Sequence, residues 1–473
     1  MKTKSVKLFI LGCLLPFGWT NLASCNNDDE NIQLANYESY MSNVVQNRLK
    51  AKYNIQFPYY TVAELIESKF EKFYDIAIPC GYEVISLLRR GWLEKIDWKK
   101  FNIPGINNSN DALNSNQLFQ NKGIKKINQQ MTKYLIDLPK SDPIFTYLKN
   151  DKTFEDNTFN ILDYGIPYFE QSFSFAYKGE KIHFYDAKTK NKIDKETLPT
   201  WNDVFYTISP SNPNLDERFD PKNNHRIAMV DDGNTIYDVA RIIETNGETN
   251  QIPSNDTSLS RMKKTFGSIT DKFSNKSTSW FYLNSDSGLI AWSLANPNGS
   301  IAALSWTGDL IYAAQGVEEF DIYDSSKYHI QKVRNGSLNE IDFMVINNKN
   351  HKNLERLNNI YSVISEITLS GYDKQLNEII QMNEQGEYKY SPTENFNATY
   401  YTPMLKNLYE AVTSNQNQTF WLEQGYKQDS IDIFINALQA ITDENDTYLY
   451  GRTKTPLENS NIHFAWLEAR GNL

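Results

Sequence analysis

The sequence predicts an α/β fold, and three observations support that prediction. Short β-prone runs alternate with helical stripes of apolar residues along the first hundred positions. Hydrophobic residues make up 40% of the 473-residue chain and aromatic residues 13%, which is ample material for buried cores. At about 150 residues per domain, this length predicts two or three domains.

The first predicted elements lie between residues 40 and 73. Apolar residues at helical spacing predict a helix over 40–50, and the alternation in 54–57 predicts a strand. A second helical stripe follows, formed by Val62, Leu65, Ile66, Phe70 and Phe73. Together these elements begin a repeated helix and strand pattern.

Residues 74–91 carry the clearest unit of this pattern. Residues 74–79 read as a strand, Cys80-Gly81 as a turn, and the residues after them as a helix that ends at Gly91. Glu83 in the first turn of that helix suits its dipole. Ligands of α/β sheets collect at the carboxyl ends of strands, beside helix N-termini, so Tyr82 is placed for ligand contact.

Two stretches, 101–156 and 372–397, are rich in Asn, Gln, Lys and Glu. We expect both to be peripheral insertions with some helix. The final third closes with a predicted helix that has Ser430 as N-cap and places Ile431, Phe434, Ile435 and Leu438 on one face.

The N-terminus reads as a secretory signal. Lys2, Lys4 and Lys7 precede an uncharged apolar stretch from Leu8 to Trp19, and the small residues of Leu22-Ala23-Ser24 precede Cys25. This arrangement resembles the lipobox of bacterial lipoproteins, which implies a signal peptide over 1–24 and a lipid-modified Cys25. The alternative is an ordinary cysteine beside an ordinary signal. We expect a lipid-anchored tether over 25–35 and a protein on the extracellular face of the cell membrane.

The net charge of the chain and the motifs that it lacks limit the kinds of partner and cofactor that we expect. Residues 1–24 contain three lysines and no acid, so their removal moves the formal charge from −10 to −13. An acidic surface argues against nucleic acid and is compatible with a cationic partner. Cys80 is then the one cysteine left for the folded body, so the fold cannot depend on internal disulfides. The five histidines lack metal-ligand spacing and no nucleotide loop is present, so we expect no cofactor and no metal.

Several segments together resemble the bacterial spermidine/putrescine-binding proteins, the solute receptors of polyamine ABC importers. The resemblance is carried by the collinear order of these segments rather than by any one of them. They are Asn36–Tyr40, Tyr74–Tyr82, Gly91–Asp97, Gly165–Tyr168, Thr200–Phe205, Asp231–Gly233, Ser305–Gly308 and Tyr401–Pro403.

The resemblance implies a two-lobe, type II periplasmic-binding-protein-like fold with the ligand in the cleft between the lobes. It implies a first lobe of residues 36–164 plus about 330–400, and a second lobe of 165–329 plus about 401–473. It also implies a polyamine ligand, the permease subunits of an ABC importer as partners, and no covalent chemistry.

A polyamine needs carboxylates for its ammonium groups and aromatic faces along its methylenes. Matching positions to the family implies ligand contacts from Tyr37, Tyr40, Tyr82, Asp232, Trp306 and Tyr401. Glu38 and Glu170 lie close to matched positions and add candidate charges. Each has a structural alternative: a tyrosine packs in the core, Asp232 caps a helix, and Glu38 and Glu170 are solvated.

The chain departs from the family pattern at two places. Thr235 stands where the family usually has a second carboxylate, and Asn339 and Ile341 replace a Trp and an Asp. Glu340 and Asp342 flank these positions and are further candidate ligand acids, because a one-residue shift of the alignment would restore an acid there. Such a shift in a strand also changes the face on which a side chain lies. Two other classes stay open: a glycosidase-like hydrolase, whose paired carboxylates leave no local signature, and an adhesin without a small ligand.

Overall fold

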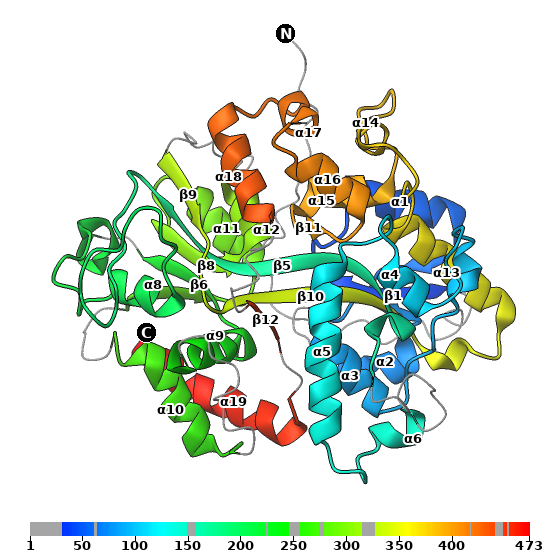
Figure 1. Ribbon diagram of the computed structural model, residues 1–473, viewed down its shortest axis with the longest axis horizontal. Helices are drawn as coiled ribbons and strands as arrows, with labels where there is room; N and C mark the ends of the chain where they lie inside the picture. Colours follow the sequence, from blue (N-terminus) through cyan, green and yellow to red (C-terminus); the bar gives the residue numbers. More distant parts are fainter. Residues whose placement is uncertain are drawn as a thin grey trace, which may run out of the picture. The chain divides into compact units, whose positions relative to one another are not determined.

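A mixed β-sheet of 12 strands organises the part of the chain that the computed structural model describes (Figure 1). The described residues are 31–60, 64–148, 158–223, 226–245, 256–273, 279–314, 327–416, 418–439, 448–451 and 454–473. Within them, the main order of strands is β2-β1-β4-β10-β5-β8-β6-β7.

Two long antiparallel strands connect two groups of parallel strands in this sheet. The parallel groups are β1 (Ile32–Tyr37), β2 (Ile55–Gln56) and β4 (Ile76–Ala77), and β6 (Ile227–Val230), β7 (Phe281–Asn284) and β8 (Ala302–Trp306). Between them, β10 (Ser337–Ile346) pairs with β4, and β5 (Gly165–Lys178) pairs with both β10 and β8 (Figure 1). The expected lobe boundaries remain a prediction, but these two strands are the direct connections between the groups.

Four short strands attach to this path. They are β3 (Tyr59–Tyr60) on β1, β9 (Tyr328–Gln331) and β11 (Thr402–Pro403) on β5, and β12 (Tyr448–Tyr450) on β10. β12 is parallel to β10 and pairs with residues 337–339, so a C-terminal segment lies beside the middle of the sheet.

The first helices largely follow the predicted pattern. They are α1 (Asn43–Lys52), α2 (Glu64–Phe73) and α3 (Gly81–Arg89). Ser42 caps α1 by accepting a hydrogen bond from the Val44 amide at 3.2 Å. The prediction that Phe73 belongs to the apolar face of α2 was wrong, because its side chain is 60% exposed. Val62 lies outside the described residues.

The unit over 74–91 is confirmed with one correction. Cys80 is the N-cap of α3 and Gly81 already belongs to the helix. The Glu83 carboxylate turns back to accept a hydrogen bond from the Cys80 amide at 3.0 Å. Gly91 follows the helix with a φ of +72°, a conformation that suits a glycine after a C-cap.

Each of the two stretches expected to be peripheral insertions contributes a buried helix to the core. In 101–156, α5 (Asn121–Asp137) buries Ile124, Ile127, Met131 and Leu135. In 372–397, α15 (Ser391–Thr399) is almost wholly buried, and its Glu394 and Asn395 accept hydrogen bonds from Ser42. Polar composition misled the prediction because α5 keeps its apolar residues on one face, and because Glu394 and Asn395 of α15 are buried with their oxygens accepting hydrogen bonds from Ser42.

The remaining helices pack around the sheet. They are α4 (Ser109–Asn114), α6 (Ile144–Leu148), α8 (Trp201–Thr207), α9 (Gly233–Thr245), α10 (Leu259–Thr270), α11 (Ser287–Ala295), α12 (Thr307–Ala314), α13 (Leu354–Thr368), α14 (Leu376–Ile379), α16 (Lys406–Thr413), α17 (Thr419–Glu423), α18 (Gln428–Leu438) and α19 (Pro456–Ala469). The predicted apolar face of α18 is buried, but its N-cap is Lys427 rather than Ser430. Among the helices of the described residues, none is long and apolar enough to span a bilayer.

Candidate functional site

Two carboxylates of β10 face a group of buried and half-buried tyrosines. Glu340 and Asp342 are 7% and 0% exposed. Asp342 accepts a hydrogen bond from the Tyr40 hydroxyl and another from the Gln171 side-chain amide, the latter at 2.5 Å. Both carboxylates also interact with the Cys80 thiol. The alternation of a strand therefore places Glu340 and Asp342 on one face and Ile341 on the other.

Tyrosine rings surround these acids. The ring centroid of Tyr40 lies 5.8 Å from that of Tyr37 and 5.1 Å from that of Tyr401, both edge-on. Tyr37 ends β1, Tyr40 follows it, and Tyr82 lies in the first turn of α3. We call Tyr37, Tyr40, Tyr82, Tyr401, Glu340 and Asp342 the tyrosine–carboxylate cluster. Six of the residues predicted from the sequence thus lie in one region.

The electrostatics of the cluster favour a bound cation. Burial raises the pKa of Glu340 to about 8, with further contributions from the charges of Asp342 and Asp232. Burial also raises the pKa of Asp342. A cation beside these groups favours their ionised forms, so binding a cation and losing a proton are coupled here. Burial raises the pKa of Tyr37, Tyr40, Tyr82 and Tyr401 as well, so their hydroxyls stay neutral.

The thiol of Cys80 lies within this cluster, 4.0 Å from the Tyr37 hydroxyl. Burial raises its pKa, and the charges of Asp342, Glu340 and Glu83 raise it further. A thiol held in its protonated form is a poor nucleophile. The arrangement therefore favours a structural role for Cys80 and does not favour covalent catalysis by it.

Asp232 lies at the edge of the cluster as the cap of α9. Its carboxylate accepts hydrogen bonds from the Asn234 and Thr235 amides, each at 3.1 Å. The structural alternative for Asp232 is therefore observed. Its charge still raises the pKa of Glu340 and Tyr82, so Asp232 adds to the negative potential of the cluster. Thr235, which replaces the second family carboxylate, donates its hydroxyl to Asp232.

Trp306 directly precedes α12 in the chain, and Tyr401 contacts α12. Trp306 ends β8, is half-buried, and has its ring centroid 5.5 Å from that of Phe173. Tyr401 packs closely on Gly308 and donates its hydroxyl to Asp309 at 2.8 Å. Burial raises the pKa of Asp309 to about 6. Trp306 thus lies two positions before Gly308, which Tyr401 contacts, but the ring of Trp306 packs on Phe173. We therefore do not include Trp306 in the tyrosine–carboxylate cluster.

The two candidate acids Glu38 and Glu170 lie elsewhere. Glu38 is exposed. Glu170 is buried on β5 and pairs with Ile341, whereas its neighbour Gln171 pairs with Glu340. Residues paired directly across antiparallel strands share a face. Glu170 therefore lies on the face opposite to the two cluster acids, and Gln171 takes the position beside them.

Gln171 and Lys454 are residues of this region that sequence reasoning missed. Gln171 donates to both Asp342 and the Tyr40 hydroxyl. The Lys454 ammonium lies 5.3 Å from the Tyr82 ring centroid. Gln171 could have been predicted from the pairing of β5 with β10, which places it opposite Glu340. That pairing joins segments far apart in the sequence. Within the described residues, no group of three or more His, Cys, Asp or Glu side chains could hold a metal ion.

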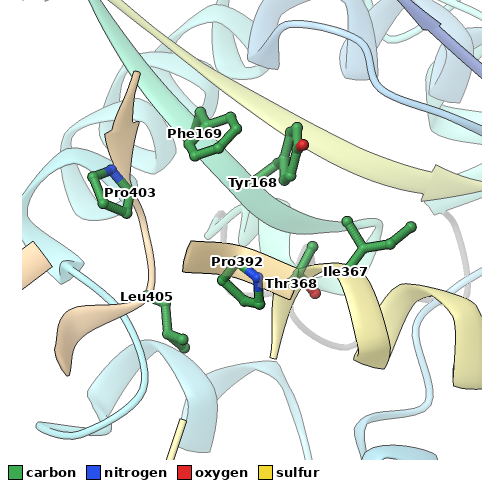
Figure 2. A pocket seen from close by; sticks show the side chains of 7 residues that line it. All are labelled: Tyr168, Phe169, Ile367, Thr368, Pro392, Pro403 and Leu405. Atoms are coloured by element: carbon green, nitrogen blue, oxygen red, sulfur yellow. The ribbon is translucent and has the colours of Figure 1, made fainter. Parts of the chain in front are cut away.

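A small cavity lies beside the cluster, and Tyr168 belongs to its lining. Figure 2 shows its lining, which is Tyr168, Phe169, Ile367, Thr368, Pro392, Pro403 and Leu405. Its volume of about 10 Å³ is close to the minimum for one water molecule. Tyr168 connects it to the cluster by donating its hydroxyl to the Tyr40 carbonyl at 3.0 Å. We assign no ligand to this cavity because a diamine cannot fit in it.

Replacing Glu340 by Gln is expected to remove a pH dependence of stability. The pKa of Glu340 is higher in the folded chain than its ordinary value of 4.5, so the folded state holds a proton that the unfolded state has lost. The free energy of unfolding of the wild type should therefore fall as the pH rises from about 5 to about 8, and fall less in Glu340→Gln. Urea unfolding at both pH values measures this, with exposed Glu355→Gln as control. If the free energy of unfolding falls equally in wild type, Glu340→Gln and Glu355→Gln, Glu340 is not the source of the pH dependence.

Comparisons with solved structures identify the class of this fold. A candidate spermidine/putrescine ABC transporter protein from Listeria monocytogenes matches with a TM-score of 0.52 and 14% identity, over 93% of this chain and 98% of that chain. The Tp0655 (TpPotD) lipoprotein of Treponema pallidum matches with a TM-score of 0.50 and 14% identity, over 93% and 99%. Thiaminase I from Bacillus thiaminolyticus matches with a TM-score of 0.48 and 11% identity, over 93% and 100%.

The fold is therefore that of the type II periplasmic solute-binding proteins, as the resemblance implied. The family is also defined. A model described as hypothetical lipoprotein (MG045 family) matches residues 1–460, so the chain belongs to that family. A search of curated proteins gave no significant match.

Proposed function

We propose that this protein is a lipid-anchored, extracytoplasmic receptor that binds a polyamine and delivers it to the permease of an ABC importer. The observation that carries the proposal is the tyrosine–carboxylate cluster, in which Glu340 and Asp342 are buried beside four tyrosines. Carboxylates that are costly to ionise alone are stabilised by an ammonium partner. Aromatic faces suit the methylenes and the charge of such a ligand.

The anchor and the permease are parts of the same proposal. Membership of a lipoprotein family supports acylation of Cys25, which itself lies outside the described residues. The name of the Listeria structure supports a polyamine as ligand and an ABC permease as partner, and the name of the Treponema structure supports a lipoprotein. We propose lobes of 36–164 plus about 330–400 and of 165–329 plus about 401–473, with the cluster between them.

The experiment is a thermal and chemical unfolding series on the purified protein with putrescine and spermidine. A ligand that binds only the folded state at a hundredfold excess over Kd stabilises it by about 2.7 kcal/mol. We expect stabilisation by both amines and none by 1,4-butanediol, which has the methylenes of putrescine without its charges. If neither putrescine nor spermidine stabilises the protein, the proposal is contradicted.

The same preparation tests the enzymatic alternative. The raised pKa of the Cys80 thiol disfavours a thiolate nucleophile in the cluster. A glycosidase would use two carboxylates, and Glu340 and Asp342 are a pair of that kind. Release of reducing sugar from glycans, lost in Glu340→Gln, would replace the receptor proposal with a hydrolase.

A further inference from the structure

A C-terminal segment lies directly against the tyrosine–carboxylate cluster. β12 pairs with β10 up to Asn339, and the Gly451 amide donates to the Asn339 carbonyl at 3.2 Å. A Cβ on Gly451 would lie 2.7 Å from a carboxylate oxygen of Glu340 and 3.0 Å from the Tyr82 ring. The backbone at Gly451 therefore packs on two cluster residues, where a larger side chain does not fit without movement.

The side chain of Lys454 brings an ammonium group to the same place. Lys454 is 4% exposed. Its Nζ lies 2.8 Å from an Asp238 carboxylate oxygen and 5.3 Å from the Tyr82 ring centroid. Its charge also acts on Glu340, where it lowers the pKa against the effect of burial. A carboxylate, an aromatic face and a second acid nearby are the surroundings that one ammonium group of a polyamine needs.

We propose that Lys454 is a specificity-determining residue, a built-in cation that fills one ammonium subsite formed by Asp238, Tyr82 and Glu340. This inference rests on the proposed polyamine-binding function. A ligand then finds one charged position already taken, and a further ammonium group placed there meets repulsion from Lys454. The site therefore favours a diamine such as putrescine over a triamine such as spermidine.

A purely structural role is the competing explanation. Asp238 also lies 3.6 Å from the Arg241 guanidinium, so Lys454 could serve only to hold the C-terminal segment on α9. Breaking a buried ion pair destabilises a protein in either case. Stability alone does not separate the two roles, and the test must measure the choice between ligands and the chemistry of the subsite.

The first measurement is calorimetric binding of putrescine and spermidine to wild type and to Lys454→Met, which keeps most of the side-chain volume without the charge. We expect the ratio of spermidine to putrescine affinity to rise at least tenfold in Lys454→Met. The matched control is Lys178→Met, which removes another buried ammonium, one that donates to the Asn296 carbonyl at 2.8 Å. An unchanged ratio in Lys454→Met overturns the specificity role.

The second measurement does not depend on polyamine binding. Lys454→Ala removes the atoms of a propylamine, so added propylammonium should raise the melting temperature of this variant and leave wild type unchanged. Propanol is the uncharged control, and Lys454→Ala with Asp238→Asn should lose the effect. If propylammonium stabilises Lys454→Ala while wild type binds no polyamine, the proposed function fails and the ammonium subsite stands. If polyamines bind but neither the ratio nor the propylammonium effect appears, the inference about Lys454 fails alone.

Discussion

Replacing Asp342 by Asn is expected to weaken polyamine binding between about tenfold and a hundredfold. Asp342 is wholly buried, and its carboxylate is oriented by hydrogen bonds from Tyr40 and Gln171. An amide has the same shape but no charge, and a hydrogen bond to a charged group contributes about 1.5–3 kcal/mol. Isothermal titration calorimetry with putrescine measures the loss, with exposed Asp373→Asn as the matched control.

The effect of this substitution on folding should have the opposite sign. Burial raises the pKa of Asp342, so the ionised carboxylate is costly in the folded chain without a ligand. Asp342→Asn should therefore be at least as stable as wild type at pH 8, and weaker binding cannot be attributed to unfolding. An affinity within twofold of wild type would remove Asp342 from the site.

Replacing Asp75 by Asn is expected to destabilise the fold by about 3–5 kcal/mol, because it removes the counter-charge of the largely buried Arg356 guanidinium. Asp75 precedes β4 and is 0% exposed. Its carboxylate accepts from the Arg356 guanidinium at 2.7 Å and from the Gln33 amide at 2.8 Å, and lies 3.4 Å from the Lys349 ammonium. It therefore joins β1 and α13 at the sheet.

Urea unfolding measures this loss. The comparison is Lys52→Met, which removes a more exposed ion pair with Glu366 at 3.4 Å and should cost less than about 1 kcal/mol. Similar losses in both variants would mean that the buried network around Asp75 adds little to stability. Polyamine binding by refolded Asp75→Asn should be unchanged, because Asp75 contacts no member of the cluster that we describe.

Local sequence patterns predicted the fold where each unit is short and self-contained. The strand, cap and helix over 74–91 follow from apolar spacing, an acid in the first helical turn and a terminal glycine. The same approach failed for α5 and α15, whose composition is polar. Burial of α15 depends on hydrogen bonds between Ser42 and Glu394 or Asn395, more than 350 positions apart. The pattern of residues within one segment gives no information about such long-range hydrogen bonds.

The candidate site could be predicted in part. The resemblance placed Tyr37, Tyr40, Tyr82 and Tyr401 together, and the structure brings them to the two acids of β10. It could not decide between Glu170 and Gln171, because that choice depends on the register of two strands far apart in sequence. Lys454 gave no local signal, since its surroundings are created by α9, α3 and β10 together.

One irregularity in the sheet has a mechanical consequence. The register between β10 and β5 shifts between Ile341 and Phe343, in the interval that contains Asp342. A bulge bends the strand that carries the extra residue and increases its local twist. The extra residue lies in β5, where Tyr168 and Phe169 together stand opposite Asp342. The bend and added twist of β5, which pairs with β10 on one side and with β8 on the other, therefore lie directly beside this carboxylate. A change in the curvature of β5 and a change in the surroundings of Asp342 would occur at the same place.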